Sequence, residues 1–478
     1  MSILWTANTV LAAVGGEATG RGWTVSGISI DSRTLEKGDL FVALDGENAD
    51  GHVYVARAFA NGATAALVSR PTDEMRALGP LVIVPDVLEA LNALGRAARA
   101  RSLAKVVAVT GSVGKTSTKE ALRLVFEAQG RTHASVASYN NHWGVPLSLA
   151  RMPASTEYAV FEIGMNHEGE ITPLTQLVRP HVAIVTTVEA VHLAHFSSID
   201  AIARAKAEIF TGIEPDGTAI LNADNPHLDL LTREARAAGV EHILTFGEET
   251  GADVRLEKVA LLENCSCVTA NIDGVPVVYK VGVPGRHLVM NSLAVLAAVK
   301  AVGGDLALAA MALAQFAAPK GRGERHAIVT EGKRILLIDE SYNANPASMK
   351  AAIAALGQAI PKGRGRRIAV LGDMLELGPQ AELHHARLAQ ALLDARVDRL
   401  FAAGPLTRHL YEAVPEHMRA HAAAASSTLV PLLAESLRDG DVVMVKGSLG
   451  SRMGQIVEAL LEANELNEDV MDKTEGGI

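Results

Sequence analysis

The central part of the chain repeats one pattern, a short unbroken run of aliphatic residues followed by a spacer with helical periodicity. The runs are KVVAVTG, YAVFEIG, VAIVTTV, TAILNAD and HILTFG, all between residues 105 and 247. Strands that are apolar on both faces are typical of a parallel sheet that helices cover on both sides. The runs RILLIDE, RIAVLGD, RLFAAG and DVVMVKGS repeat the pattern after residue 333. The sequence therefore predicts an α/β fold with two separate parallel sheets.

Changes in the pattern of apolar runs and turns divide the 478 residues into three parts. Three is also the number of domains that a chain of this length favours. Residues 24–84 alternate short apolar runs with Gly/Asp turns and predict a small α/β unit. Residues 253–283 have an antiparallel pattern, in which Asp273-Gly274 is a hairpin signal. The stretch AAPKGRG, residues 317–323, predicts a hinge. The predicted domains are residues 1–84, 85–318 and 319–478.

Composition and charge exclude several classes of protein. Hydrophobic residues make up 49% and charged residues 21%, which excludes a disordered or fibrous chain. The net charge of −10 argues against a nucleic-acid-binding protein. The most apolar stretch, residues 288–318, is interrupted by polar residues, so we expect no membrane span. We expect Cys265 and Cys267 to be reduced thiols. The sequence has no Lys or Arg before Arg21, so the basic start of a secretory signal is missing, and together these features predict a cytoplasmic location.

The most specific motif is VVAVTGSVGKTST, residues 106–118, in which a strand runs into a glycine-containing turn and then a helix. Backbone N–H groups and a helix N-terminus make such a turn an anion site. The Lys115 side chain would reach the β- and γ-phosphates of a nucleotide, and the Thr116 hydroxyl would bind Mg²⁺. Because Val109 stands where the standard phosphate loop has a glycine, this is a shortened form. The predicted nucleotide-binding residues of the loop are Gly111, Ser112, Gly114, Lys115, Thr116 and Ser117.

Two further side chains follow strands of the same predicted sheet. Glu162 lies at the end of the run YAVFEIG, and His192 comes just after VAIVTTVEAV. Because strand ends in an open parallel sheet meet at one edge, we expect both near the phosphate loop. A carboxylate and an imidazole there suit a divalent cation that bridges phosphate and substrate. A buried structural acid and an ordinary loop histidine are the alternatives.

Other polar residues have a ligand role and a structural role as open alternatives. Asn140-Asn141 precede a Gly-Val-Pro turn, where side-chain amides either contact a ligand or cap the chain. Lys206 lies on an amphipathic helix, where a solvent-exposed lysine is the simpler interpretation. His287 and Asn291 share one helix face, which either faces a purine or packs within the protein.

Polar residues also follow the strands of the C-terminal set. Tyr342, Asn343 and Asn345 lie on one loop, and two amides beside a tyrosine on a strand-end loop are typical of a recognition surface. The remaining candidates are Arg322 and Arg325 in the hinge, and Asp339, Asp373, Glu376, Lys446, Gly447 and Ser448 after strands.

Taken together, these motifs resemble the Mur ligase family of peptidoglycan synthesis over nearly the whole chain. Asp31-Ser32-Arg33 and Asp50-Gly51-His52 are similar to the family's first domain, and TGSVGKTST is similar to its ATP loop. Asn140-Asn141 with GVP, the run FEIGMN, and His192 before AKAEI follow in family order. The stretches ESYNANPASM and LGDMLELG resemble the third domain of members that add D-Ala-D-Ala. The Asp-Asn-Pro-Arg stretch expected of members that add the third amino acid is absent.

The resemblance implies a three-domain ligase, with a UDP-sugar-binding domain, a central ATP-binding domain and a Rossmann-like C-terminal domain for the incoming amino acid. The implied reaction is ATP-dependent amide formation between UDP-N-acetylmuramoyl-tripeptide and D-Ala-D-Ala. ATP would phosphorylate the terminal carboxylate of the tripeptide, and the dipeptide amine would attack the acyl phosphate. ATP and Mg²⁺ are the implied cofactors. We expect a cytoplasmic monomer, and the third peptide residue stays open between diaminopimelate and lysine.

The resemblance also assigns roles to residues of this sequence. Lys115, His192 and Lys206 would be catalytic; Thr116, Glu162 and His192 would bind Mg²⁺; His287 and Asn291 would contact adenine; Arg322 and Asp339 would lie near phosphate and ribose; and Ser32, Arg33, Asn140, Asn141, Tyr342, Asn343, Asn345 and Asp373 would contact substrates. At Leu288 the sequence departs from the family, because members often have Asn there. Lys206 matches a lysine that is carbamylated in some members only, so its position alone carries over.

Other functions share some of these features. A P-loop kinase or NTPase would use the phosphate loop but leave the third domain without a role, and its phosphate release would not depend on an amine. A folyl-polyglutamate-type synthetase shares the loop but is not expected to contain YNANP. A non-catalytic binding protein is disfavoured by the intact set of Lys115, Thr116, Glu162 and His192. The hinge predicts an open resting form that closes when ligands bind.

Overall fold

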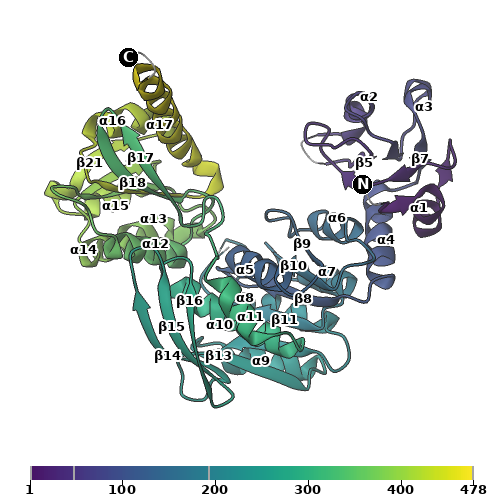
Figure 1. Cartoon of the computed structure of the whole chain (residues 1–478), viewed down its shortest axis with the longest axis horizontal. Helices are drawn as coiled ribbons and strands as arrows, with labels where there is room; N and C mark the ends of the chain where they lie inside the picture. The colour runs from purple at the N-terminus through teal and green to yellow at the C-terminus, as the bar shows by residue number, and fades with distance from the viewer. Residues whose placement is uncertain (1–2, 47–48, 192–193, 476–478) are drawn as a thin grey trace.

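The computed structural model describes residues 3–46, 49–191 and 194–475, with side chains as far as residue 464. Within these ranges, three larger sheets with their helices follow one another along the chain, and a two-stranded sheet lies at its N-terminal end. The unit built on the nine-stranded sheet lies between the N-terminal and C-terminal units (Figure 1). The predicted α/β fold is therefore confirmed.

The N-terminal sheet has five strands in the order β2-β7-β6-β5-β4, and its neighbours are parallel except for β2 and β7. Its strands are β2 (Glu17–Ala18), β4 (Gly27–Ser29), β5 (Asp39–Val42), β6 (Ala65–Val68) and β7 (Leu81–Ile83), and β1 (Trp5–Thr6) pairs separately with β3 (Thr24–Val25). Its helices are α1 (Ala7–Val14), the 3₁₀ helix η1 (Gly51–Tyr54), α2 (Val55–Ala60) and α3 (Asp73–Leu78). The small α/β unit expected over residues 24–84 is present.

Helix α4 (Val87–Ala100) joins the N-terminal and central units within one buried cluster. Leu91 and Leu94 pack with buried residues of the N-terminal sheet and with Leu147 of α6 (Gly144–Ala150). The sequence prediction assigns this helix to the central domain, after residue 84. Its packing ties the N-terminal unit to the central one through shared apolar side chains.

The central sheet has nine strands in the order β16-β15-β14-β13-β12-β11-β8-β10-β9. Neighbouring strands are parallel from β9 to β14 and antiparallel from β14 to β16, as predicted. Its strands are β8 (Lys105–Thr110), β9 (Thr132–Ala134), β10 (Tyr158–Glu162), β11 (Val182–Val185), β12 (Thr218–Asn222), β13 (His242–Gly247), β14 (Val254–Leu261), β15 (Ser266–Ile272) and β16 (Val275–Val281). Asp273 and Gly274 join β15 to β16 with φ values of 52° and 82°, which a two-residue hairpin turn requires.

Helices cover both faces of the central sheet because its strands are apolar on both. In β8, Val107 and Val109 belong to one buried cluster, whereas Val106 and Ala108 belong to another. The first face carries α5 (Lys115–Glu127), α10 (Arg286–Ala301) and α11 (Leu306–Leu313), and the second carries α6, α7 (Ile171–Val178), α8 (Ile199–Ala207), η2 (Glu208–Gly212) and α9 (Leu228–Ala237).

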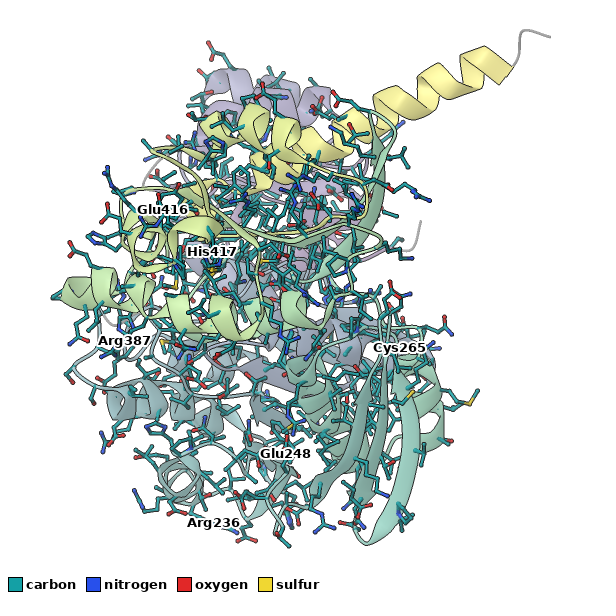
Figure 2. The ribbon with its side chains drawn as sticks, turned by 90° about the vertical axis from the view of Figure 1, so that its left-hand side faces the viewer. Arg236, Glu248, Cys265, Arg387, Glu416 and His417 are labelled. Atoms are coloured by element: carbon teal, nitrogen blue, oxygen red, sulfur yellow. The ribbon has the colours of Figure 1, made fainter. Side chains whose placement is uncertain are left out.

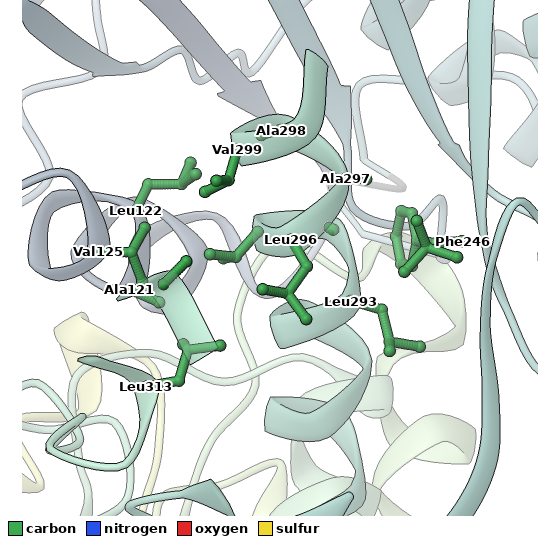
Figure 3. Packing of buried hydrophobic residues seen from close by; sticks show 14 of the residues in the cluster. Ala121, Leu122, Val125, Phe246, Leu293, Leu296, Ala297, Ala298, Val299 and Leu313 are labelled. Atoms are coloured by element: carbon green, nitrogen blue, oxygen red, sulfur yellow. The ribbon is translucent and has the colours of Figure 1, made fainter. Parts of the chain in front are cut away.

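Helix α10 is buried along most of its length. Its side chains lie between Leu122 of α5 and Phe246 of β13 (Figure 3). This packing brings the N-terminal part of α10 to the start of α5, where Asn291 closely approaches Gly114.

The C-terminal sheet has six strands in the order β17-β18-β22-β19-β20-β21, and its neighbours are parallel except for β17 and β18. Its strands are β17 (Glu324–Thr330), β18 (Lys333–Glu340), β19 (Arg367–Gly372), β20 (Arg399–Ala403), β21 (Arg419–Ala423) and β22 (Val442–Lys446). Its helices are α12 (Pro346–Gln358), η3 (Gly378–Gln380), α13 (Ala381–Ala386), α14 (Leu388–Asp394), α15 (Thr407–Ala413), η4 (Glu416–Met418), α16 (Ser426–Ser436), η5 (Leu449–Ser451) and α17 (Gly454–Glu475). Buried clusters lie on both faces, as in the predicted Rossmann-like unit, and α17 extends away from the body (Figure 2).

Two further predictions concern the cysteines and the apolar helices. Cys265 and Cys267 are free thiols, and Cys265 lies at the antiparallel extension of the central sheet (Figure 2). No helix in the described ranges combines the length and the apolar character needed to cross a membrane.

Replacing Leu296 by Ala is expected to lower the free energy of unfolding by about 2–5 kcal/mol, because the side chain is fully buried in α10 and leaves a cavity. Leu308→Ala on α11 removes the same atoms from a side chain that is 42% exposed. This variant should change the free energy of unfolding by no more than about 0.5 kcal/mol. Urea unfolding of both variants measures the difference. Equal losses would contradict the packing described for α10.

Candidate active site

A cavity of about 540 Å³ lies between the central and the C-terminal sheets and is lined by residues of both units. It collects most of the predicted site residues. Those that line it are Ser112, Gly114, Lys115, Thr116, Ser117, Asn140, Asn141, Glu162, His287, Asn291, Arg322, Tyr342, Asn343 and Asn345. Loops of the C-terminal unit thus share one cavity with the phosphate loop, and the closure expected on ligand binding stays a prediction.

The phosphate loop follows β8, whose neighbours β10 and β11 continue the sheet in opposite directions. Such a switch point is where parallel sheets place their ligands. Gly111 and Gly114 have φ values of 147° and 86°, and a Cβ atom on Gly111 would lie 1.9 Å from Thr186 Oγ1. A Cβ atom on Gly114 would lie 2.9 Å from Asn291 Oδ1. Both glycines are needed for the turn and for the close approach of its neighbours.

Lys115 begins α5 and folds back over the loop, where its Nζ donates to the Gly111 carbonyl oxygen at 2.8 Å. Burial lowers the pKa of Lys115, the Glu162 carboxylate opposes this change, and the Arg322 guanidinium adds to it. The ammonium group is therefore held at the turn and faces the cavity, where an anion would stabilise its charge.

Thr116, Glu162 and Asn140 form a hydrogen-bonded cluster beside Lys115. The Thr116 hydroxyl donates to Glu162 Oε2 at 2.8 Å, and the Asn140 amide donates to Glu162 Oε1 at 2.7 Å. Glu162 ends β10 and is only 1% exposed. A hydroxyl and a carboxylate this close are oxygen donors of the kind that Mg²⁺ prefers, so the residues present fit this cation. His192, the third predicted magnesium ligand, lies outside the described residues.

Lys206 is buried on α8, so the interpretation as a solvent-exposed lysine is wrong. Its side chain is 3% exposed and forms no hydrogen bond or ion pair with the part of the chain that the structure describes. Burial, and then the nearby charge of Lys115, lower the pKa of Lys206 well below its ordinary value. The helix pattern alone does not predict this burial, because it depends on how α8 packs against the sheet.

His287 and Asn291 lie on the N-terminal part of α10 and line the cavity. Burial lowers the pKa of His287, the Glu340 carboxylate opposes this change, and the Lys446 ammonium adds to it. Leu288, the next residue along the helix, is buried in the core of the central unit. The helix face therefore divides into a polar part at the cavity and an apolar part in the core.

Arg322 connects the hinge to both sides of the cavity. Its guanidinium carbon lies 4.2 Å from the centre of the Tyr342 ring, an arrangement that favours a cation–π contact. Its Nη2 lies 3.4 Å from Ser138 Oγ, and Ser138 Oγ lies 3.4 Å from Thr116 Oγ1. Ser138 thus links a hinge residue to the predicted magnesium cluster.

Asp339, Asp373 and Asn345 fix the backbone of the C-terminal unit. Asp339 accepts from the N–H groups of Gly321 and Ser341, at 3.1 Å and 3.0 Å. Asp373 accepts from the Thr407 N–H and hydroxyl, both at 2.7 Å, and the Asn345 side chain caps α12. Asp339 and Asp373 do not line the cavity, and their ribose and dipeptide contacts stay predictions.

Sequence reasoning gave no role to several polar residues that line the cavity, among them Ser138, Glu189 and Glu340, and it named Lys446 only as a candidate after a strand. Lys446 Nζ lies 3.1 Å from Glu340 Oε2 and donates to the Asn343 carbonyl oxygen at 2.9 Å. These two side chains end neighbouring strands, so the strand-end rule that singled out Lys446 also applies to Glu340. Ser138 and Glu189 lie on loops whose positions depend on long-range packing.

The predicted substrate residues of the N-terminal unit lie outside this cavity. Ser32 is buried, and its carbonyl oxygen accepts from the Asn61 amide at 2.7 Å. Arg33 is exposed, and its Nη2 lies 2.7 Å from Asp31 Oδ2. Any substrate that contacts both these residues and the phosphate loop must therefore be extended.

Three matches to known domains cover most of the chain. Residues 24–101 match the Mur ligase family catalytic domain, residues 109–299 the Mur ligase middle domain, and residues 321–449 the Mur ligase glutamate ligase domain. The chain belongs to the Mur ligase family.

Within this family, the chain is similar to the UDP-N-acetylmuramoyl-tripeptide–D-alanyl-D-alanine ligases. It is 36% identical to that of Escherichia coli strain K12, over 94% of this chain and 96% of the relative, and 34% identical to that of Bacillus subtilis strain 168, over 92% and 94%. The crystal structure of MurF from Acinetobacter baumannii superposes with a TM-score of 0.82 at 32% identity, covering 96% of this chain and 99% of that one. MurF from Thermotoga maritima, solved in complex with ADP, gives 0.76 at 25% identity, over 92% and 98%.

We expect the carboxyl group of Asp31 to titrate far below its ordinary range. The hydrogen bond from the Arg33 side chain, and then that from its backbone N–H, lower the pKa of Asp31 from 3.8 to about 2. Because the folded-state pKa is depressed, this carboxylate stabilises the fold above its ordinary pKa, and the contribution is lost as the pH falls toward about 2. In Arg33→Ala the pKa should return toward 3.8, as carbon-13 NMR of labelled aspartates can measure. An unchanged pKa would show that the Arg33 side chain is not the cause.

Proposed function

We propose that this protein is the ATP-dependent ligase that joins D-Ala-D-Ala to UDP-N-acetylmuramoyl-tripeptide in peptidoglycan precursor synthesis. One observation carries the proposal. Lys115 and Glu162 of the central unit line the same cavity as Tyr342 and Asn343 of the C-terminal unit. A ligase needs such a shared cavity, because an acid activated by ATP on one side has to meet an amine held on the other.

Activation of the tripeptide brings like charges together. A carboxylate about 4 Å from a phosphate charge is repelled by roughly 4 kcal/mol at an effective dielectric constant of about 20. Lys115 and the N–H groups of the loop would bind the β- and γ-phosphates and lower this repulsion. Thr116, Glu162 and His192 would hold Mg²⁺, which supplies further positive charge to the phosphate oxygens when bound.

The remaining contribution to the reaction is the positioning of ATP and the dipeptide. His287 and Asn291 would orient the adenine end of ATP, and Arg322 would lie toward the phosphates. Asn343 and Asn345 would orient the dipeptide so that its amine and the acyl carbon approach to about 3–3.5 Å. Little covalent chemistry by the protein is needed.

We extend the proposal to the organisation of the protein. The domains would comprise residues 1–84, 85–318 and 319–478, with the UDP-sugar end of the substrate bound by the first of them through Ser32 and Arg33. The enzyme would act as a monomer in the cytoplasm, and the free thiols of Cys265 and Cys267 are consistent with this location.

Phosphate release from ATP measures the proposed function directly. With UDP-N-acetylmuramoyl-tripeptide present, we expect sustained release only when D-Ala-D-Ala is added, because the acyl phosphate turns over through the amine. Lys115→Ala should lower this rate by about 10²–10³-fold, since the ammonium stabilises charge that develops in the reaction. Phosphate release that is independent of the amine would instead support a kinase or NTPase. If Lys115→Ala kept more than about a tenth of the wild-type activity, the assignment of Lys115 to the active site would be wrong.

Lys206→Ala should be inactive if the buried amine is modified. A lysine with a strongly lowered pKa is uncharged in part of the population, and an uncharged amine combines with CO₂ to form a carbamate and release a proton. The resulting anion near Lys115 would hold a second Mg²⁺. Addition of acetate or another short-chain carboxylate should then partly restore activity, as steady-state phosphate release can measure. Full activity of Lys206→Ala would end the idea, whereas inactivity without rescue would favour an unmodified structural lysine.

A further inference from the structure

The loop that follows β11 is fixed to the phosphate loop by its backbone. The Ser112 hydroxyl donates to the Glu189 carbonyl oxygen at 3.1 Å and accepts from the Glu189 N–H at 2.9 Å. The Asn225 amide donates to Thr187 Oγ1 at 2.9 Å and to the Val188 carbonyl oxygen at 3.1 Å. Glu189 is thus held in place through its main chain, and it is one of the residues that line the cavity.

Among the described residues that line the cavity, four carry carboxylates, and Glu189 alone has no hydrogen-bond or ion-pair partner for its own. The three engaged carboxylates and their donors are Glu162 with Thr116 and Asn140, Glu170 with Asn166 and His167, and Glu340 with Lys446. A half-buried carboxylate without a donor carries a desolvation cost that a cationic ligand would remove. Three of the four carboxylates thus already have donors, whereas that of Glu189 is available to a substrate.

The second half of the proposed reaction supplies a suitable cation. The α-amino group of a dipeptide has a pKa of about 8, so it is largely protonated at neutral pH and has no lone pair for attack. It must therefore be received as an ammonium ion and lose a proton within the cavity. Glu189 lies beside Ser112 of the phosphate loop, where the acyl phosphate would form, and shares the cavity with Asn343 and Asn345.

We propose that Glu189 binds the ammonium group of the incoming dipeptide and accepts its proton before the amine attacks the acyl phosphate. This inference rests on the proposed function. The first proton passes from nitrogen to the Glu189 carboxylate, and the freed lone pair forms the C–N bond. The C–O bond to phosphate breaks, phosphate leaves with that electron pair, and the second proton passes from nitrogen to the phosphate oxygen. The protonated Glu189 then returns its proton to water.

The charges around Glu189 are compatible with this role. Burial raises the pKa of Glu189, which brings it closer to that of the amine, and Lys350 of α12 and His227 act in the opposite direction. Neither forms an ion pair with Glu189, and His227 Nε2 instead lies 3.1 Å from Asp200 Oδ1. Lys350 faces the same carboxylate from the C-terminal unit, so its effect has to be separated from that of the dipeptide.

Two nucleophiles separate proton transfer from the earlier steps. Glu189→Gln keeps the shape of the side chain but cannot accept a proton, and we expect kcat/KM for D-Ala-D-Ala to fall by about 10²-fold at neutral pH. Hydroxylamine is uncharged at that pH, and its capture of the acyl phosphate as a hydroxamate should be unchanged in the variant. The loss with D-Ala-D-Ala should shrink as the pH rises past the amine pKa, because the solvent then removes the proton.

Two control variants and the wild-type enzyme decide how the result is interpreted. Glu234→Gln on the surface of α9 makes the same chemical change away from the cavity and should alter neither reaction. Lys350→Met should keep the wild-type ratio of the two reactions, and a loss equal to that of Glu189→Gln would overturn the proposal in favour of a contact between units. Equal loss with both nucleophiles, or no loss with either, would also overturn it. A wild-type enzyme that does not respond to D-Ala-D-Ala would refute the proposed function instead, so the two failures are distinguishable.

Discussion

The turn from Gly111 to Gly114 is the constraint on which the cavity depends. Its two glycines adopt backbone angles that side chains rarely tolerate, and the missing Cβ atoms admit Thr186 on one side and Asn291 on the other. Through these contacts the turn sets the position of the loop after β11 and of the N-terminal part of α10. A larger residue at either glycine would therefore separate three elements at once, and not only narrow the anion site.

Buried charges explain how the cavity stays both stable and reactive. Glu340 satisfies Lys446 at 3.1 Å, and this pair holds the Asn343 carbonyl oxygen without needing a ligand. Within the described ranges, Lys115 and Lys206 have no comparable carboxylate partner, and burial lowers the pKa of both. The Lys446 charge is thus already paired, whereas the Lys115 ammonium remains for an anionic ligand to neutralise.

The sequence was sufficient where local rules decide the structure. The phosphate loop, Glu162 and the Asp273-Gly274 hairpin follow from short motifs and from the position of a residue at the end of a strand. The same rule placed Asp373 toward a ligand; its Oδ1 accepts from the N–H and hydroxyl of Thr407, and its contact with the dipeptide stays a prediction. The burial of Lys206 and the availability of Glu189 depend on packing between distant segments, which no local pattern records.

Helix α4 has a consequence for which substrates such an enzyme accepts. Because Leu91 and Leu94 complete one core and also contact Leu147 of the neighbouring unit, the first two units cannot turn independently without exposing apolar surface. The distance between Arg33 and the phosphate loop is then fixed by the fold. A fixed separation of this kind selects substrates by their length. A peptide one residue shorter, bound at its nucleotide-sugar end, would not bring its carboxylate to the phosphate loop.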